Sequence, residues 1–275
     1  MKKFLLDFSG ASPVTALRFM LLAALWFYVL CFMAYGKERN SRQCLSPLSF
    51  LTEDWPPYQY IENGILKGVT VDLLLAILKE ANAEQTLAEI EVVPWARGYS
   101  RVKTQPNTVL FSMTRTPERE EMFKWAGPIL KNDTYFIGRK DQGIRIAGPA
   151  DLYQYRFGVI IDDASEMFAK RHGIPSENIT KNSRADLNMR MLEAGRIDFV
   201  ITGWTAFEVE ARRAGANPSD YDRFFLADSS EVYFAFSKST PDRVVTCFEA
   251  AFDSVKATGK FDHLFRPQQS YGPLN

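Results

Sequence analysis

Apolar residues recur at helical spacing in several parts of the chain. Val71, Leu74, Leu75 and Leu78 lie three or four positions apart, which is the period of a helix with one buried face. Capping residues near the start, and glycine or asparagine near the end, help to bound the other candidates. The helices predicted in this way cover residues 69–82, 94–103, 165–171, 185–194 and 241–258.

Short apolar runs between these segments predict strands. They cover residues 49–52, 90–93, 109–113, 156–161 and 197–202. Asn63-Gly64 predicts a tight turn, and the prolines within residues 53–58 exclude regular structure from that loop. Strands that alternate with helices indicate the α/β class, with a mostly parallel sheet covered on both faces.

Two aromatic-rich extended segments, 133–138 and 231–236, flank the middle α/β block. If the chain leaves a first unit at one segment and returns at the other, a second unit is inserted through a two-stranded hinge. We therefore expect one lobe from residues 45–133 plus 235–275, and a second lobe from residues 134–234.

Residues 1–36 resemble an export signal. Lys2, Lys3 and Arg18 precede the uncharged run 19–35, and small residues before position 37 fit cleavage after Gly36. The alternative is an uncleaved membrane anchor, because the run is near the lower limit for spanning a bilayer. We expect a periplasmic protein, which in the second case is held at the membrane.

The charge balance argues against one class of function, nucleic-acid binding. Lys+Arg 33 and Asp+Glu 33 cancel, and no basic stripe indicates nucleic-acid binding. Cys44 and Cys247, which remain after cleavage, could pair in an oxidising compartment or stay as buried thiols. The histidines His172 and His263 fit no metal or nucleophile motif, so no cofactor, metal or catalytic residue is predicted.

The stretch Thr114–Glu120, TRTPERE, contains the most informative charges. Thr116 before Pro117 predicts a helix start, where acidic residues are favourable and Arg119 is not. A guanidinium beside free helical amides would suit a carboxylate ligand. The alternative is a surface pair between Arg119 and a neighbouring glutamate.

The order of these motifs resembles the periplasmic solute-binding proteins of ABC importers, family 3, the polar amino-acid type. The resemblance runs from about Leu48 to Phe265 and is most specific at Gly68–Leu74, GVTVDLL, and at Thr114–Arg119, TRTPER. It implies a type 2 periplasmic-binding fold of two lobes, with the ligand trapped in the cleft when the hinge closes. It also implies a monomer that serves an ABC permease.

The resemblance assigns candidate ligand-binding residues. It implies that Arg119 binds the ligand carboxylate and that Ser112 and Thr114 add hydrogen bonds. It also implies that the aromatic rings of Trp55 and Tyr58 lie against the ligand. Either ring could instead only pack against the prolines. Arg97, which opens the helix after Pro94, is a second candidate for an anion.

Two positions depart from the family pattern. Gly203 stands near the place where members that bind α-amino acids have an aspartate for the ammonium group. Asp162 and Asp163 replace a turn that normally offers donors to a carboxylate, although Asp163 could simply cap a helix. We therefore expect a small polar solute, amino-acid-like or a related organic ion, with an anionic end at Arg119 and a cationic end at Asp162, Asp163 or Asp54.

Two other functions remain open at this point. A periplasmic dehydratase of the same fold could use Glu53 or Asp54 as a proton donor. A membrane-anchored sensor could bind a solute and report it to a partner protein.

Overall fold

The computed structural model describes residues 26, 45, 48–260 and 262. The predicted export signal or anchor, residues 1–36, lies outside them except for Trp26, and so does Cys44. Within the described residues, no helix is long and apolar enough to cross a membrane. Cys247 is disulfide-bonded, and the other cysteines of the chain lie outside the described part.

Eight strands form one mixed sheet in the order β4-β1-β5-β10-β6-β9-β7-β8. Four of its strand pairings are parallel: β1 with β4, β1 with β5, β7 with β8 and β7 with β9. The strands are β1 (Ser49–Thr52), β4 (Glu91–Val92), β5 (Thr108–Thr114), β6 (Phe123–Arg139), β7 (Phe157–Ile160), β8 (Ile179–Asn182), β9 (Phe199–Gly203) and β10 (Tyr221–Ser237). The α/β class and the largely parallel sheet are confirmed.

Six α-helices cover this sheet in the described residues. The first half of the sheet, β4, β1 and β5, carries α2 (Val69–Glu80), α3 (Trp95–Thr104) and α7 (Asp242–Ala257). The second half, β9, β7 and β8, carries α4 (Ala164–Arg171), α5 (Ala185–Glu193) and α6 (Trp204–Arg213). Five of these helices match the sequence prediction.

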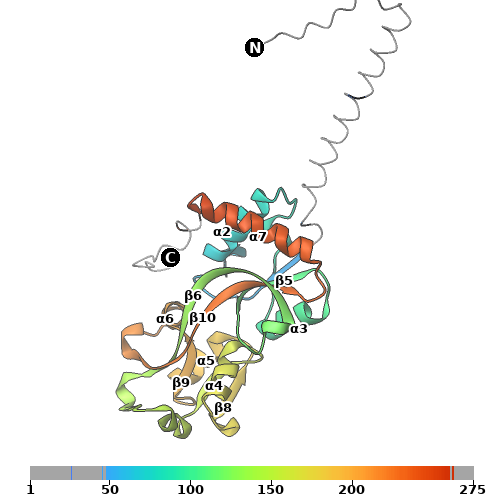
Figure 1. Ribbon diagram of the computed structural model, residues 1–275. Helices are drawn as coiled ribbons and strands as arrows, with labels where there is room; N and C mark the ends of the chain where they lie inside the picture. Colours follow the sequence, from blue (N-terminus) through green and yellow to red (C-terminus); the bar gives the residue numbers. More distant parts are fainter. Residues whose placement is uncertain (1–25, 27–44, 46–47, 261, 263–275) are drawn as a thin grey trace, which may run out of the picture. The chain divides into compact units, whose positions relative to one another are not determined.

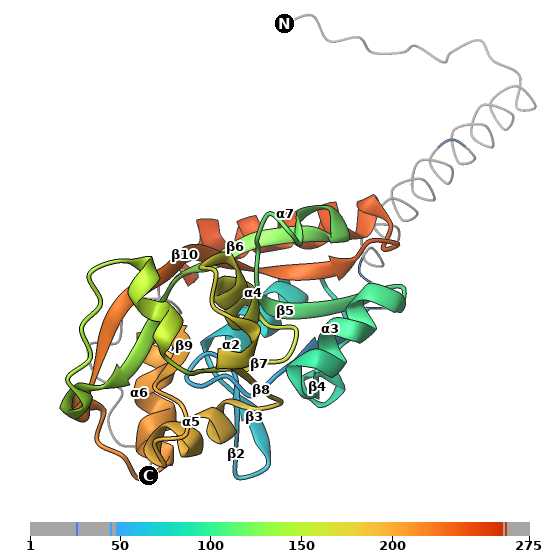
Figure 2. The same ribbon diagram turned by 90° about the horizontal axis from the view of Figure 1, so that it is seen from below.

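Strands β6 and β10 join the two halves. They pair antiparallel along nearly their whole length, and Figure 1 shows them as two long curved ribbons that pass from the level of α7 down to β9. Figure 2 shows the same pair from below, with α3 and β4 on one side and α5 and α6 on the other. The predicted hinge segments lie inside these two strands, while the predicted lobe boundaries at 133/134 and 234/235 stay a prediction.

A separate two-stranded hairpin contains the predicted turn. β2 (Tyr60–Glu62) pairs with β3 (Ile65–Lys67), and Asn63 and Gly64 both have positive φ, as a two-residue hairpin turn requires. Gly68, just after the hairpin, also has a positive φ, 121°, and a Cβ there would lie 2.2 Å from the Tyr58 carbonyl oxygen. Only glycine therefore lets α2 start against the Trp55–Tyr58 loop.

Each half has its own apolar core. Leu51, Leu110 and Met113 pack with Trp95 and Val102 of α3 in the first half. In the second half, Phe157 and Phe199 stack at 5.5 Å and meet Phe136 of β6 edge to face. Rings from the crossing strands thus belong to the cores that they connect, which fixes the ends of β6 and β10 to both halves.

Three sequence predictions need correction. The predicted helix start at Thr116 is wrong, because residues 117–119 form a turn and only a 3₁₀ turn, Glu120–Met122, precedes β6. Six residues between Thr116 and Phe123 are too few for a stable helix. The prediction also missed β8 and α6.

Candidate functional site

The carboxyl ends of four strands lie around one cavity. β1 and β5 of the first half end at Thr52 and Thr114, and β7 and β9 of the second half end at Ile160 and Gly203. Residues at or just beyond these ends line a cavity of about 100 Å³, which we call the acidic cavity. Ligands of open α/β sheets bind outside the carboxyl ends of strands, so this is the expected place for a site.

The lining of the acidic cavity combines aromatic and polar residues. Its aromatic residues are Trp55 from the loop after β1, Phe168 from α4 and Phe207 from α6. The uncharged polar residues are Ser112, Thr114, Asn132, Thr134, Ser165, Asn188 and Thr202. Apolar walls with a few placed polar groups are typical of small-molecule sites.

Carboxyl groups crowd the acidic cavity. Burial first, and then the charges of Asp163 and Asp54, raise the pKa of Glu53 well above its ordinary value, against an opposing effect of Arg119. Burial also raises the pKa of Glu210, with Arg213 opposing the shift and Asp54 adding to it. The acids therefore repel one another, and Glu53 binds a proton more readily than an exposed glutamate.

Asp163 has a structural role as well as a place in the lining. Its Oδ1 accepts a hydrogen bond of 2.9 Å from the backbone N–H of Ser165, which caps α4. The predicted capping role is confirmed. Its carboxylate still faces the cavity, and its charge is felt by Glu53.

Arg119 lies beside the acidic cavity but does not line it. The side chain is fully buried, and its guanidinium donates to the carbonyl oxygens of Thr114 (3.1 Å) and Asp162 (2.9 Å). It stands over the rings of Trp95 (5.4 Å) and Tyr99 (5.1 Å), and its Nε has no hydrogen-bond partner among the described residues.

The alternative of a surface pair for Arg119 is wrong, since the side chain is buried. Its neighbour Arg115 makes that kind of contact instead, with Glu120. The carboxylate-binding role of Arg119 stays a prediction that no ligand in the structure tests.

The loop at Asp162 joins the two halves. Asp162 has φ 59, and its carbonyl oxygen accepts hydrogen bonds from Arg119 and from the indole N–H of Trp95 (2.9 Å). Its backbone N–H donates to Glu166, which holds the loop from the second half. Ion pairs between Arg171 and Glu118 and between Arg213 and Asp54 also connect the halves.

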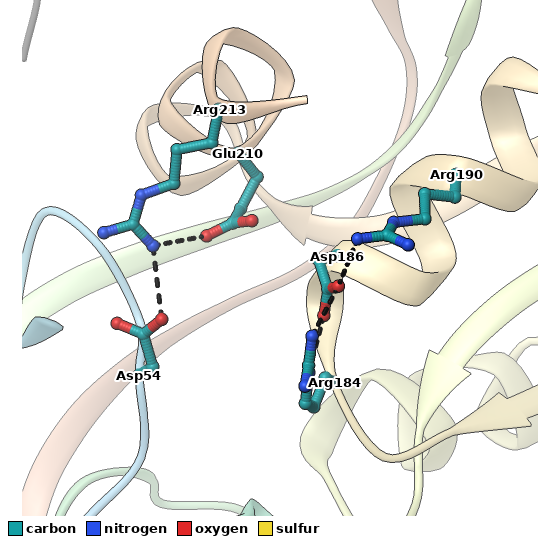
Figure 3. A network of polar contacts seen from close by, with 6 residues as sticks. All are labelled: Asp54, Arg184, Asp186, Arg190, Glu210 and Arg213. Atoms are coloured by element: carbon teal, nitrogen blue, oxygen red, sulfur yellow. Dashed lines mark hydrogen bonds and ion pairs between the residues drawn. The ribbon is translucent and has the colours of Figure 1, made fainter. Parts of the chain in front are cut away.

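A second recess, which we call the arginine cleft, adjoins the acidic cavity. Its volume is about 420 Å³, and it shares the lining residues Glu53, Asp54, Ala185 and Glu210 with the cavity. Figure 3 shows Asp54 facing Arg213 and Glu210 of α6, with Arg184 and Arg190 both directed at Asp186. The arginines of this cleft are therefore paired with acids.

The structure brings together six of the ten predicted site residues. Asp54, Trp55, Ser112, Thr114, Asp163 and Gly203 line the acidic cavity. Arg119 and Asp162 lie next to it, Tyr58 packs on Trp55 with ring centroids 4.3 Å apart, and Arg97 is exposed on α3. All ten remain candidates until a ligand is bound.

Three of the lining residues absent from the predicted ligand-binding set are Glu53, Glu210 and Asn132. The sequence predicts Glu53 only as the proton donor of the alternative dehydratase, although it is the first residue after β1 and Asp54 is the second. Glu210 lies on α6, which the sequence prediction missed. Asn132 lies inside the long strand β6, and nothing in the sequence near it distinguishes a cavity residue.

A cavity at the carboxyl ends of strands from two halves, joined by two crossing strands, defines a ligand-binding protein of the open α/β kind. The chain belongs to the bacterial extracellular solute-binding proteins, family 3, whose model matches residues 49–267. The resemblance seen in the sequence is thereby confirmed. A comparison with curated protein sequences finds no significant match.

Solved structures share the fold at low sequence identity. A mutant of ArgBP from T. maritima is 21% identical, with TM-score 0.66 over 79% of this chain and 93% of that one. The arginine-, lysine-, histidine-binding protein ArtJ from Geobacillus stearothermophilus is 18% identical, with TM-score 0.67 over 82% and 97%. A histidine kinase sensor domain similar to periplasmic binding proteins is 16% identical, with TM-score 0.71 over 82% and 96%. They support the type 2 periplasmic-binding fold.

Proposed function

We propose that this protein binds a small polar solute in the acidic cavity, outside the cytoplasm, and delivers it to an ABC importer. The observation that carries the proposal is the cavity itself, built at the carboxyl ends of β1, β5, β7 and β9. Membership of an extracellular solute-binding family supports it. Names such as arginine-, lysine-, histidine-binding protein for a protein of the same fold are consistent with a small nitrogen-containing solute.

Binding between the halves explains why the site takes residues from both. Ser112 and Thr114 belong to the first half, and Asp163 and Gly203 to the second. A solute in contact with all four bridges the halves, so its binding energy favours the closed arrangement. Contacts such as Arg171 with Glu118 add to this closure from outside the cavity.

Thermal denaturation with a library of solutes tests the proposal. A solute that binds only the folded protein raises the midpoint of unfolding, so amino acids, diamines, polyamines, opines and small organic acids are screened on the purified protein. At least one class should raise the midpoint in a concentration-dependent way. A library without any such solute would contradict the proposed function.

Thr114→Val locates the site of a solute found in this way. The substitution keeps the shape of a side chain that lines the cavity but removes its hydroxyl, and loss of one hydrogen bond weakens binding by about tenfold. Thr180→Val on β8, whose side chain is not part of the lining, is the matched control. Equal affinities of the two variants in calorimetry would place the solute elsewhere.

One observation favours a second candidate, a lyase that donates a proton from Glu53. The raised pKa means that this carboxyl group binds a proton more readily than an exposed glutamate does, as a general acid requires. Turnover of cyclic organic acids by the purified protein, lost in Glu53→Gln, would establish this activity. Binding of such an acid without turnover would exclude it for that acid.

A further inference from the structure

Every ionisable side chain that lines the acidic cavity is an acid. These side chains are Glu53, Asp54, Asp163 and Glu210, and no Lys, Arg or His of the described residues lines it. A cavity walled by acids in a low-dielectric surrounding attracts positive charge and repels negative charge. This is the reverse of what a site for a free carboxylate requires.

Arg119 is fully buried and does not line the cavity. One N–H of each Nη donates to a carbonyl oxygen, that of Thr114 or Asp162, and the guanidinium stands over the rings of Trp95 and Tyr99, while Nε has no hydrogen-bond partner among the described residues. Its charge is felt by Glu53, which lines the cavity. Because the guanidinium is buried outside the lining, an anionic group in the cavity faces the acids and not Arg119.

Two residues in the cavity wall have polar atoms without a hydrogen-bond partner among the described residues. Thr114 is 8% exposed and Asn132 is 9% exposed, and both line the cavity. Among the described residues, the Thr114 hydroxyl has no hydrogen-bond partner, and the Asn132 amide donates to Thr134 while its Oδ1 accepts from none. Asn132 Oδ1 can only accept and the Thr114 hydroxyl can accept or donate, so both can take hydrogen bonds from a ligand that donates them.

The geometry at Gly203 explains why the expected aspartate is missing there. A Cβ at this position would lie 2.5 Å from Asn132 Oδ1, so the oxygen from β6 occupies the space in which a side chain at 203 would begin. The acceptor that would have come from the end of β9 is thus supplied by the crossing strand. Asp163 supplies negative charge, and so does Glu53 once a bound cation favours its ionised form.

We propose that the acidic cavity binds a small organic cation, an alkylammonium or guanidinium compound, that carries no carboxylate group. The cationic group donates hydrogen bonds to the carboxyl groups and to Asn132, and the aromatic rings of Trp55 and Phe207 provide further favourable contact. In the adjoining cleft, Arg184 and Arg190 are paired with Asp186. Arg213 pairs with Asp54 and Glu210, which leaves Glu53 and Asp163 as the cavity acids without an ion pair among the described residues. The inference rests on the proposed solute-binding function.

Matched ligand pairs test it by calorimetry on the purified protein near neutral pH. Agmatine differs from arginine, and cadaverine from lysine, only by the missing carboxylate. At least one of the decarboxylated compounds should bind at least tenfold more tightly than its amino acid, and glutamate should not bind.

The possible results separate this inference from the proposed function. Arginine or lysine binding as tightly as its partner, or a preference for an anionic or uncharged solute, overturns the cation inference and leaves solute binding intact. Failure of these probes and of the whole solute library overturns both.

Variants show whether the cation meets the cavity acids. Glu53→Gln keeps the size of the side chain and removes its charge, and should weaken binding of the tighter cation at least tenfold. Asp253→Asn removes an exposed acid from α7, far from the lining, and should leave binding unchanged. Unfolding midpoints of both variants confirm that they fold, and equal affinities of folded variants contradict the proposal.

Discussion

Arg119 is held by backbone oxygens and aromatic rings, and not by a carboxylate. Its two hydrogen bonds go to Thr114 in the first half and to Asp162 in the second. Buried carbonyl groups that lose a donor are left unsatisfied, at a cost of about 1–3 kcal/mol each. The side chain therefore stabilises the fold as well as the contact between the halves.

Arg119→Lys should lower the free energy of unfolding by about 3 kcal/mol, because an ammonium group cannot reproduce the forked geometry of a guanidinium. Arg97→Lys, at an exposed position on α3, should change it by no more than about 0.5 kcal/mol. Urea unfolding of both variants measures the difference. An Arg119→Lys protein as stable as the parent would show that the two carbonyl contacts are not needed.

At the residue scale, the sequence predicted those site residues that follow a recognisable strand. Asp54, Trp55, Thr114 and Asp163 lie within a few residues of a strand end, and all four line the cavity. Asn132 could not be found in this way, because its position in the cavity depends on where β6 crosses between the halves. Arg119 was noticed for its charge, but its burial against Trp95 follows from tertiary packing.

The conformation of the loop between β7 and α4 depends on one buried acid, Glu166. Glu166 accepts from the backbone N–H of Asp162 (3.1 Å) and pairs with Lys170 (2.5 Å) and Lys181 (2.7 Å). Burial opposes its ionised form, but these contacts outweigh burial and lower the pKa of Glu166 to about 2. The same loop offers the Asp162 carbonyl to Arg119 and Trp95.

Glu166→Gln should remove the part of the free energy of unfolding that depends on ionisation of this glutamate. Since the folded-state pKa lies below the value of 4.5 expected for the unfolded chain, the contribution is complete above pH 4.5 and is lost as pH falls toward 2. The variant should lose about 3 kcal/mol at neutral pH and show a flatter profile over that acid range. The glutamate side chain is 6% exposed, but Lys170 and Lys181 are 59% and 48% exposed, so solvent screens the ion pairs in part and about 3 kcal/mol is an upper value.

Urea unfolding at a series of pH values measures this profile. Glu177→Gln, at an exposed glutamate with no ion pair among the described residues, is the control and should keep the parent profile. Parallel profiles for Glu166→Gln and the parent protein would show that the lysine contacts do not stabilise the folded state.

At the element scale, strong local signals predicted the structure well. The spacing of apolar residues predicted α2 and α7, and Asn63-Gly64 predicted the turn between β2 and β3. The predicted helix at Thr116 failed because capping residues describe only how a helix starts, while β6 begins too soon afterwards. The length and curvature of β6 and β10 depend on pairing between distant segments, which a local pattern does not contain.

At the scale of the whole molecule, the proposed function makes closure and binding depend on each other. The acidic cavity lies between the halves, and the ion pair of Asp54 with Arg213 stands where the cavity meets the arginine cleft. Such half-exposed pairs contribute at most about 1 kcal/mol, so they can break to admit a solute. A solute that touches both halves then favours the closed state.

Small-angle X-ray scattering should therefore show a smaller radius of gyration for the purified protein at saturating solute than without it, because hinge closure compacts two bodies. The Thr114→Val protein should show the same change only at higher solute concentration. An unchanged radius of gyration at saturation would mean that binding does not require closure.

A crystal structure of the protein with the tighter of agmatine and cadaverine tests the central claim most directly. We expect the cationic group between Glu53, Thr114 and Asn132, with Arg119 still bound to the carbonyls of Thr114 and Asp162. A ligand bound outside the acidic cavity, or one whose polar group has displaced Arg119 from these carbonyls, would contradict the account.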